Sequence, residues 1–392
     1  MKAGWLTKTL GEILQKTETT NPLQLPETEF EYIDVSSVSN STFQIEETQT
    51  LKGKNAPSRA RRLVKTNDVI FATIRPTLRR IAIVPEYFDK QVCSTGYFVL
   101  RPEAEIDHRF LFYWLFTQDF MGAMEQLQKG ASYPAVTDAE VRAQRIPFPP
   151  LPEQQRIVGI LDAAFDGIAT AKANAEQNLQ NARALFESHL QSVFTQRGEG
   201  WLEKSLSDVC AITSTLVDPR KKEFLDLTHV GAGNIESQTG VFVELKTARE
   251  EGLISGKFLF DESMVLYSKI RPYLMKVARP NFSGLCSADM YPLAPLLNEI
   301  TRDYLFHLLL SKPFTDYAIQ GSARAGMPKV NREHLFEFRV WLPNVKKQTE
   351  LASKLDALHE ETQRLESLYQ RKLAALDELK KSLLHQAFSG AL

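Results

Sequence analysis

The sequence predicts an α+β protein built from two duplicated globular domains and two long helices. Three observations predict this fold. Related segments recur at an interval of about 195 residues. Short β-branched and aromatic runs dominate the first part of each half, and a proline-free segment with heptad spacing closes each half. With 392 residues, of which 43% are apolar, the chain can form two or more folded domains.

The duplication covers the whole chain. The third matching block contains 6 identities in 21 positions. An interval of about 195 residues is far too long for a solenoid repeat, so a complete domain with its connector has been duplicated. The matching segments are 5–10 with 201–206, 74–78 with 270–274, and 145–165 with 339–359.

The first part of each half alternates strand and helix signals. Runs rich in Val, Ile and aromatic residues, interrupted by Pro, Gly, Asn and Asp, predict strands. Asp107 is an expected helix N-cap before an apolar segment. The expected strands are 31–35, 68–74, 81–84, 97–100 and 264–270, and the expected helices are 107–118 and 301–310.

The second part of each half predicts a long helix. Residues 153–194 contain no proline, and their apolar residues recur every three or four positions, as they do again in residues 346–388. A helix of 42 residues spans about 63 Å. We expect the two helices to pack antiparallel as a coiled-coil spacer with a pseudo-two-fold axis and a domain at each end. The alternative is that each helix packs separately on its own domain.

Motifs that would indicate catalysis are missing. The sequence has no nucleotide-binding glycine loop, no metalloprotease motif, no nucleophile elbow, and no Asn/Asp-Pro-Pro-Tyr/Phe tetrapeptide for adenine methylation. The three cysteines form no CxxC, and no secretion signal or 18-residue apolar run is present. We therefore expect a cytoplasmic, non-catalytic protein without a metal site.

Local positive charge is the strongest binding signal in a chain whose net charge is −1. Residues 52–80 contain nine basic residues and one acid, and residues 263–287 contain four basic residues and no acid. Clusters of this kind contact DNA phosphates. The alternatives are a solvated surface and, for the Ile-Arg-Pro segments, a structural turn. The candidates are Arg59, Arg61, Arg62, Lys65, Arg75, Arg79 and Arg80 in the first half, and Lys221, Lys222, Lys269, Arg271, Tyr273 and Lys276 in the second.

Two loops rich in small residues, 129–136 and 321–330, end the domains. Small residues let the backbone approach a ligand closely. Tyr133, Arg324 and Lys329 are the side chains that we expect to reach DNA bases. A purely structural loop before a strand is the alternative.

The segment 146–158, Ile-Pro-Phe-Pro-Pro-Leu-Pro-Glu-Gln-Gln-Arg-Ile-Val, resembles the specificity subunits of type I restriction–modification systems. The Gly130-x-x-x-Pro134-x-Val136 loop and the duplicated layout resemble that family too. The second copy of the segment, 341–348, departs from the pattern, because Asn344 replaces a proline and Lys347 replaces the glutamate.

The resemblance implies two target recognition domains, 1–150 and 198–344, and two spacer helices, 151–197 and 345–392. Each domain would read one half of a split, asymmetric DNA target. Methyltransferase subunits, two in number, and restriction subunits would carry the chemistry with S-adenosylmethionine, ATP and Mg, while this chain would bind no cofactor. The residues implied in partner contact are Pro150, Leu151, Glu153, Gln154, Arg156, Ile157 and Leu161.

Other functions remain open at this point. A specificity subunit of a related system of the type IIB or IIG kind would have the same sequence features. If the chain were a coiled-coil scaffold without a DNA role, charge reversal at Arg59, Arg61 and Arg62 would leave any DNA binding unchanged. A hydrolase would show turnover by the purified chain alone.

Overall fold

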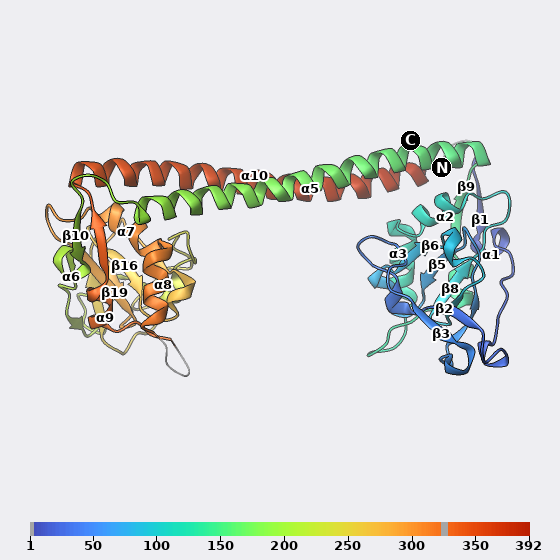
Figure 1. The fold of residues 1–392 in the computed structure, drawn as a ribbon, viewed down its shortest axis with the longest axis horizontal. Helices are drawn as coiled ribbons and strands as arrows, with labels where there is room; N and C mark the ends of the chain where they lie inside the picture. Colours follow the sequence, from blue (N-terminus) through green and yellow to red (C-terminus); the bar gives the residue numbers. More distant parts are fainter. Residues whose placement is uncertain (1–3, 323–327) are drawn as a thin grey trace. The chain divides into compact units, whose positions relative to one another are not determined.

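The computed structural model describes residues 4–322 and 328–392. The chain divides into two compact units, one formed by residues 1–175 with 371–392 and the other by residues 176–370. Each unit contains one globular domain and a segment of each long helix (Figure 1). Each long helix is thus divided between the two units, so that both units consist of the same parts, as expected of a duplicated chain.

The first domain is built on two small sheets and a terminal strand pair. One sheet has the order β3-β2-β7-β4, the other β6-β5-β8, and β1 pairs with β9. Only β2 and β7 run parallel among these pairs. The strands are β1 (Leu6–Thr9), β2 (Glu29–Ile33), β3 (Gln49–Lys52), β4 (Ala60–Leu63), β5 (Val69–Ala72), β6 (Ile81–Ile83), β7 (Val92–Ser94), β8 (Tyr97–Leu100) and β9 (Arg145–Phe148).

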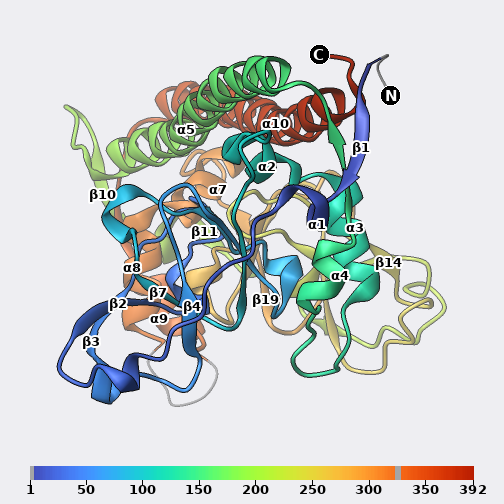
Figure 2. The same ribbon diagram turned by 90° about the vertical axis from the view of Figure 1, so that its right-hand side faces the viewer.

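Short helices complete this domain, as Figure 2 shows for α1, α2, α3 and α4. The predicted helix 107–118 corresponds to α2, which ends earlier, at Trp114, and a separate helix begins at Gln118. The Asp107 side chain accepts hydrogen bonds from the backbone of Arg109 and Phe110 and starts the first, while Thr117 caps the second. The helices are α1 (Leu10–Ile13), α2 (His108–Trp114), α3 (Gln118–Leu127) and α4 (Asp138–Arg142).

The second domain repeats the plan. Its sheets have the orders β12-β15-β18-β13-β14 and β11-β19-β16-β17, with β10 paired to β20, and β13 and β18 form the parallel pair. The strands are β10 (Leu202–Ser205), β11 (Cys210–Ala211), β12 (Leu216–Val217), β13 (Thr228–Val230), β14 (Lys246–Thr247), β15 (Lys257–Phe260), β16 (Val265–Ser268), β17 (Val277–Ala278), β18 (Gly284–Cys286), β19 (Met290–Pro295) and β20 (Arg339–Leu342). The helices are α6 (Leu206–Val209), α7 (Arg302–Leu310), α8 (Lys312–Gln320) and α9 (Arg332–Glu337).

Strand β5 shows why these apolar runs form strands. All four of its residues are buried, because both faces of the strand are covered. Val69 and Phe71 point into one apolar cluster, whereas Ile70 and Ala72 point into another, as the two-residue period of a strand requires. Strand β16 divides its side chains between two clusters in the same way.

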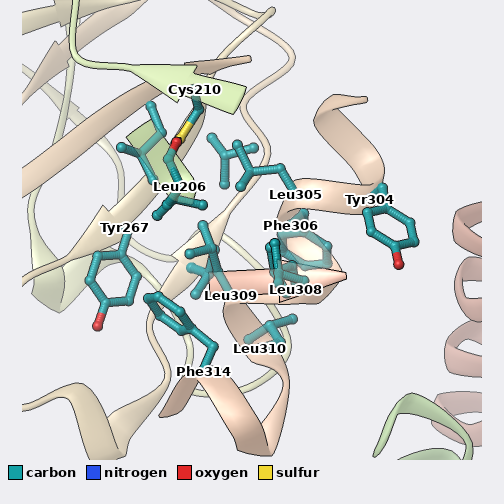
Figure 3. Close-up of a cluster of buried hydrophobic side chains, with 14 of the residues drawn as sticks. Leu206, Cys210, Tyr267, Tyr304, Leu305, Phe306, Leu308, Leu309, Leu310 and Phe314 are labelled. Atoms are coloured by element: carbon teal, nitrogen blue, oxygen red, sulfur yellow. The ribbon is translucent and has the colours of Figure 1, made fainter. Parts of the chain in front are cut away.

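The largest cluster of the second domain surrounds α7. Every residue from Tyr304 to Leu310 is buried, and Figure 3 shows Leu305, Leu308 and Leu309 beside Leu206 and Phe314. The ring of Tyr304 lies 5.0 Å from that of Phe194 on the long helix α5. A helix buried on all sides therefore connects the sheet to the long helices.

The long helices are α5 (Leu151–Thr195) and α10 (Val345–Ser389), each of 45 residues. In the first unit, Arg156 donates to the Leu392 carbonyl and Lys172 pairs with Asp377. In the second unit, Arg183 pairs with Glu366, and Phe186 contacts His359. Within each unit the two segments lie side by side and antiparallel, which confirms the predicted pairing.

Candidate nucleic-acid interface

The same strained turn occurs in both domains after a buried strand. In the first domain it surrounds the short 3-10 helix η4 (Pro76–Leu78), and in the second it surrounds η7 (Pro272–Leu274). Arg75 and Arg271 precede these helices with φ of 50° in both cases, and Arg79 and Met275 follow with φ of 54° and 46°. Left-handed backbone at non-glycine residues is costly, so its repetition marks a site where the turn matters.

Each turn is joined to the small-residue loop that the sequence singled out. The backbone N–H of Arg75 donates to the Pro134 carbonyl at 2.6 Å, and that of Arg271 donates to the Pro328 carbonyl at 2.8 Å. Isolated bridges connect Ile74 with Ala135 and Ile270 with Lys329. The two candidate segments of each domain thus form a single surface, which we call the turn–loop platform (residues 74–79 with 129–136, and 270–275 with 328–330).

Side chains of the first platform remain accessible. The Arg75 guanidinium lies 5.1 Å from the centre of the Tyr133 ring and donates to the Ser132 carbonyl at 3.3 Å. Tyr133 is 72% exposed, and Arg79 is exposed as well. In the part of the chain that the structure describes, neither Arg75 nor Arg79 forms an ion pair with an acid. Such side chains are free to contact phosphates or bases.

The basic residues before this turn differ in how much charge they can offer. Arg59 is exposed on the loop before β4 and forms no ion pair within the part of the chain that the structure describes. Arg61 donates to the Ala60 carbonyl. Arg62 pairs with Asp138 at 2.7 Å, and Lys65 with Glu18 at 2.7 Å. Of these four, Arg59 is therefore the strongest phosphate candidate.

The side chains of Arg80 and Lys276 hydrogen-bond to backbone carbonyls, and a DNA contact at either residue stays a prediction. Arg80 donates from Nη1 to the carbonyls of Val35, Ser36 and Val38. Lys276, at the equivalent position, donates from Nζ to the Ala232 carbonyl at 2.6 Å. Both side chains turn inward, because nearby 3-10 turns present carbonyl groups that need a donor.

The remaining DNA-contact candidates of the second domain are partly exposed residues and partly residues that are buried or paired with an acid. Lys221, Lys222, Arg271 and Tyr273 are exposed. Lys269 is largely buried against the Ala288 carbonyl, and burial lowers the pKa of its ammonium group. Lys329 pairs with Asp289 at 3.3 Å. Arg324 lies outside the described residues.

The residues expected at the partner surface instead fix α5 to the first domain. Gln154 is fully buried, accepts from the Asp107 N–H at 2.9 Å, and donates to the carbonyls of Glu105 and Pro149 at 3.0 and 2.9 Å. Ile157 and Leu161 are also fully buried in the domain core. These three side chains have no surface for a partner, so this part of the prediction is wrong.

The rest of that set is more accessible. Pro150 and Arg156 are exposed, whereas Leu151 and Glu153 are half-buried. Glu153 forms an ion pair with Arg156 at 2.7 Å. A partner contact at these four residues stays a prediction.

Gln348 repeats the interactions of Gln154 in the second unit. It accepts from the Thr301 N–H at 2.9 Å and donates to the carbonyls of Glu299 and Pro343 at 2.9 and 3.0 Å. We call these two side chains the amide latches. Sequence reasoning did not assign this role to Gln348, although its identity with Gln154 in the duplicated block was the available signal.

A second junction, also missed, lies about two helical turns beyond each latch. Asp162 accepts from the Tyr113 hydroxyl at 2.5 Å, while Asp356 contacts His307 Nε2 and Arg279 Nη2, both at 2.8 Å. Burial alone would raise the pKa of Asp356. The hydrogen bonds from His307 and Arg279 outweigh burial and hold this pKa well below its usual range. These carboxylates therefore serve helix attachment.

Three other features would point to a different function: a metal site, a membrane-spanning helix and a reactive cysteine. Across residues 4–322 and 328–392, no group of three or more His, Cys, Asp or Glu side chains is placed to hold a metal ion. The same residues include no helix that is both long and apolar enough to cross a membrane. Burial raises the pKa of all three thiols, Cys93, Cys210 and Cys286, to about 12, so they are poor nucleophiles.

Comparison with known proteins identifies the family. The family model described as "Type I restriction modification DNA specificity domain" matches residues 2–181 and again residues 198–373. The EcoDI specificity subunit of Escherichia coli is 28% identical over 313 residues, which cover 71% of this chain and 69% of that protein. The EcoKI specificity subunit of Escherichia coli strain K12 is 24% identical, with coverage of 76% and 69%.

Solved structures agree with this result over the full length. The HsdS subunit from Thermoanaerobacter tengcongensis matches with a TM-score of 0.74 and 27% identity, covering 100% of this chain and 98% of that one. A chain from a structure of complex assembly and conformational transition in the type I R-M system matches with a TM-score of 0.81 and 26% identity, covering 100% and 99%. Two domains on one plan, two long helices and two matches to one family model lead to a single conclusion: this chain belongs to the family of type I restriction–modification DNA specificity proteins.

Proposed function

We propose that this chain is the DNA specificity subunit of a type I restriction–modification complex and that each domain reads one half of a bipartite, asymmetric DNA target. The observation that carries the proposal is the turn–loop platform. The turn has the same backbone in both domains, including two left-handed residues, but its side chains differ at Thr77 against Tyr273 and at Arg79 against Met275. Equal geometry with unequal chemistry suits two related domains that recognise different sequences.

The platform suggests a division between phosphate and base contacts. Arg75 and Arg271 occur in both domains at the same φ, so they suit a contact that every DNA sequence offers, namely a phosphate. Thr77 stands where the second domain has Tyr273, and Arg79 where it has Met275. Positions that differ in this way, together with Tyr133, suit the reading of base edges. Arg59, Lys221 and Lys222 would add phosphate contacts.

The long helices would set the gap between the two half-targets. A helix of 45 residues is about 68 Å long at 1.5 Å per residue. At about 3.4 Å per base pair, this length corresponds to roughly 20 base pairs. Removing four residues from 171–182 is expected to change the gap or to abolish methylation, and an unchanged gap would contradict the spacer role.

The chemistry would take place on partner subunits. We propose two methyltransferase subunits, which use S-adenosylmethionine, and restriction subunits, which use ATP and Mg, with no cofactor on this chain. Pro150, Leu151, Glu153 and Arg156 are the remaining partner candidates, since their side chains are exposed or partly exposed. A prokaryotic cytoplasm would be the site of action.

Methylation mapping tests this proposal directly. The chain is expressed with its neighbouring methyltransferase subunit in a host without DNA methylation, and N6-methyladenine is mapped across the genome. We expect one split motif with a fixed gap, present only when both subunits are made. A complex that forms but gives no methylation would favour a scaffold, and turnover by the isolated chain would favour a hydrolase.

Two variants relate the mapped motif to the structure. Tyr273→Ala is expected to relax or remove one half of the motif while the other half is kept, because it alters only the second platform. Tyr87→Ala is the matched control, since Tyr87 is 71% exposed in the first domain but outside the platform. Loss of both half-motifs in Tyr273→Ala would contradict independent reading by the two domains.

A further inference from the structure

Ion pairs join α5 and α10 in both units of the described structure. In the first unit, Lys172 of α5 pairs with Asp377 of α10. In the second unit, Arg183 of α5 pairs with Glu366 of α10, with Nη2 and Oε2 at 3.1 Å. Helix α5 provides the cation both times, and α10 provides the anion both times.

This distribution of charge is unexpected in a duplicated chain. Glu366 stands 194 residues after Lys172, and Asp377 stands 194 residues after Arg183, so the two ion pairs occupy equivalent positions of the repeat. A plain duplication would give both helices the same charges. Here the two copies carry opposite charges at both contact positions.

The opposite charges matter because duplicated helices can also pair with copies of themselves. If α5 packed against α5 of a second chain in the register seen here, Lys172 would face Arg183. If α10 packed against α10 of a second chain, Glu366 would face Asp377. Like charges at such contacts are destabilising. The exchange of helices between two chains would lose four ion pairs and create four contacts between like charges.

Aromatic contacts at the same helix interface do not provide this discrimination. The Phe186 ring lies 4.8 Å from that of His359, and at the equivalent place Lys380 lies 4.9 Å from the centre of the Phe165 ring. Pairing of α5 with itself would bring Phe165 toward Phe186, which is a favourable apolar contact. These aromatic contacts thus tolerate self-pairing of α5, whereas the charges at the two ion-pair positions oppose it.

We propose that these two ion pairs select the pairing of α5 with α10 and reject the pairing of either helix with its own copy in a second chain. The partner that the α5 surface fits is a helix with carboxylates at both contact positions, as α10 has. Each ion pair is partly exposed, with side-chain exposures of 31% and 56% in the first and 51% and 27% in the second. Exposed pairs add little stability, so their role is selection of the partner, as in coiled coils whose flanking charges determine pairing.

The decisive variant combines Arg183→Glu with Glu366→Arg. Both ion pairs within the chain are kept, but each helix then carries one cation and one anion and is complementary to its own copy. The control reverses all four charges, with Lys172→Glu, Arg183→Glu, Glu366→Arg and Asp377→Lys, which keeps the discrimination with twice as many substitutions. Thermal unfolding of the full chains verifies that all three proteins are folded.

Exchange is measured by co-expressing two differently tagged full-length chains, capturing one tag and quantifying the other. Light scattering after refolding at several concentrations gives the mass. We expect the double variant to capture at least ten times more of the second chain than the wild type and the control do. Equal capture by all three would overturn the proposal. If the double variant is insoluble, Lys172→Glu with Asp377→Lys makes the same test in the first unit. DNA recognition plays no part in this result.

Discussion

Replacing Gln154 with leucine tests whether one buried amide fixes the start of α5 to the first domain. The side chain makes three hydrogen bonds, one accepted from Asp107 N–H and two donated to the carbonyls of Glu105 and Pro149. A lost hydrogen bond costs about 1 kcal/mol, and more when the former partner stays buried. Gln154→Leu is therefore expected to lower the free energy of unfolding of the first unit by about 3 kcal/mol.

The assay is urea unfolding with hydrogen exchange of peptides from both units. Gln155→Leu is the matched control, since it makes the same chemical change at an exposed neighbour and should stay within about 0.5 kcal/mol of the wild type. Gln348→Leu should weaken the second unit and leave the first unchanged. The reasoning is refuted if Gln154→Leu costs less than about 1 kcal/mol, or if its effect equals that of Gln155→Leu.

Three further predictions concern charge, pH and thiols. Arg59→Ala should reduce the salt dependence of DNA binding by about one phosphate contact, whereas Arg80→Met should lower the melting temperature, because Arg80 holds three carbonyls; a salt slope unchanged in Arg59→Ala would exclude Arg59 from the interface. Burial lowers the pKa of His229, His307 and His359 in the second unit below about 6.5. Because the unfolded chain then binds protons that the folded chain does not, the second unit should lose stability as the pH falls from about 7 to about 5.5, and His307→Tyr, which introduces the residue type of Tyr113, should reduce this loss in calorimetry. A thiol reagent should find no reactive cysteine in the native chain and all three after unfolding; fast labelling of the native chain would contradict the burial of Cys93, Cys210 and Cys286.

The sequence was sufficient for the duplication, for most strands and for the long helices, because these depend on local periodicity. The end of the first predicted helix was placed too late, since the apolar run continues to Phe116 whereas α2 ends at Trp114. Helix α3, which Thr117 caps, was not predicted. The inward turn of Arg80 could not be predicted either. The sequence does not show whether a charged side chain will lie close to backbone carbonyls that lack a hydrogen-bond donor, as Arg80 does.

Predicting which residues of the two long helices face each other would have required the register of the helix pair as well as the heptad pattern. Lys172 and Glu366 are ordinary surface residues of a heptad pattern until the structure shows that they lie opposite Asp377 and Arg183. The amide latches were hidden for a similar reason. A glutamine at the start of a helix predicts an exposed polar residue, and only the fold shows that backbone groups from a distant loop surround it.

The strained turn has a consequence for how new specificities can arise. Proline and backbone hydrogen bonds to Pro134 and Pro328 hold its shape, so the turn does not depend on the side chains at its exposed positions. If the platform reads DNA as proposed, a mutation at Thr77 or Tyr273 would change what is recognised without a cost in folding. Selection would then act on one half-target while the other is preserved, and each new variant would need a single mutation instead of a redesigned domain.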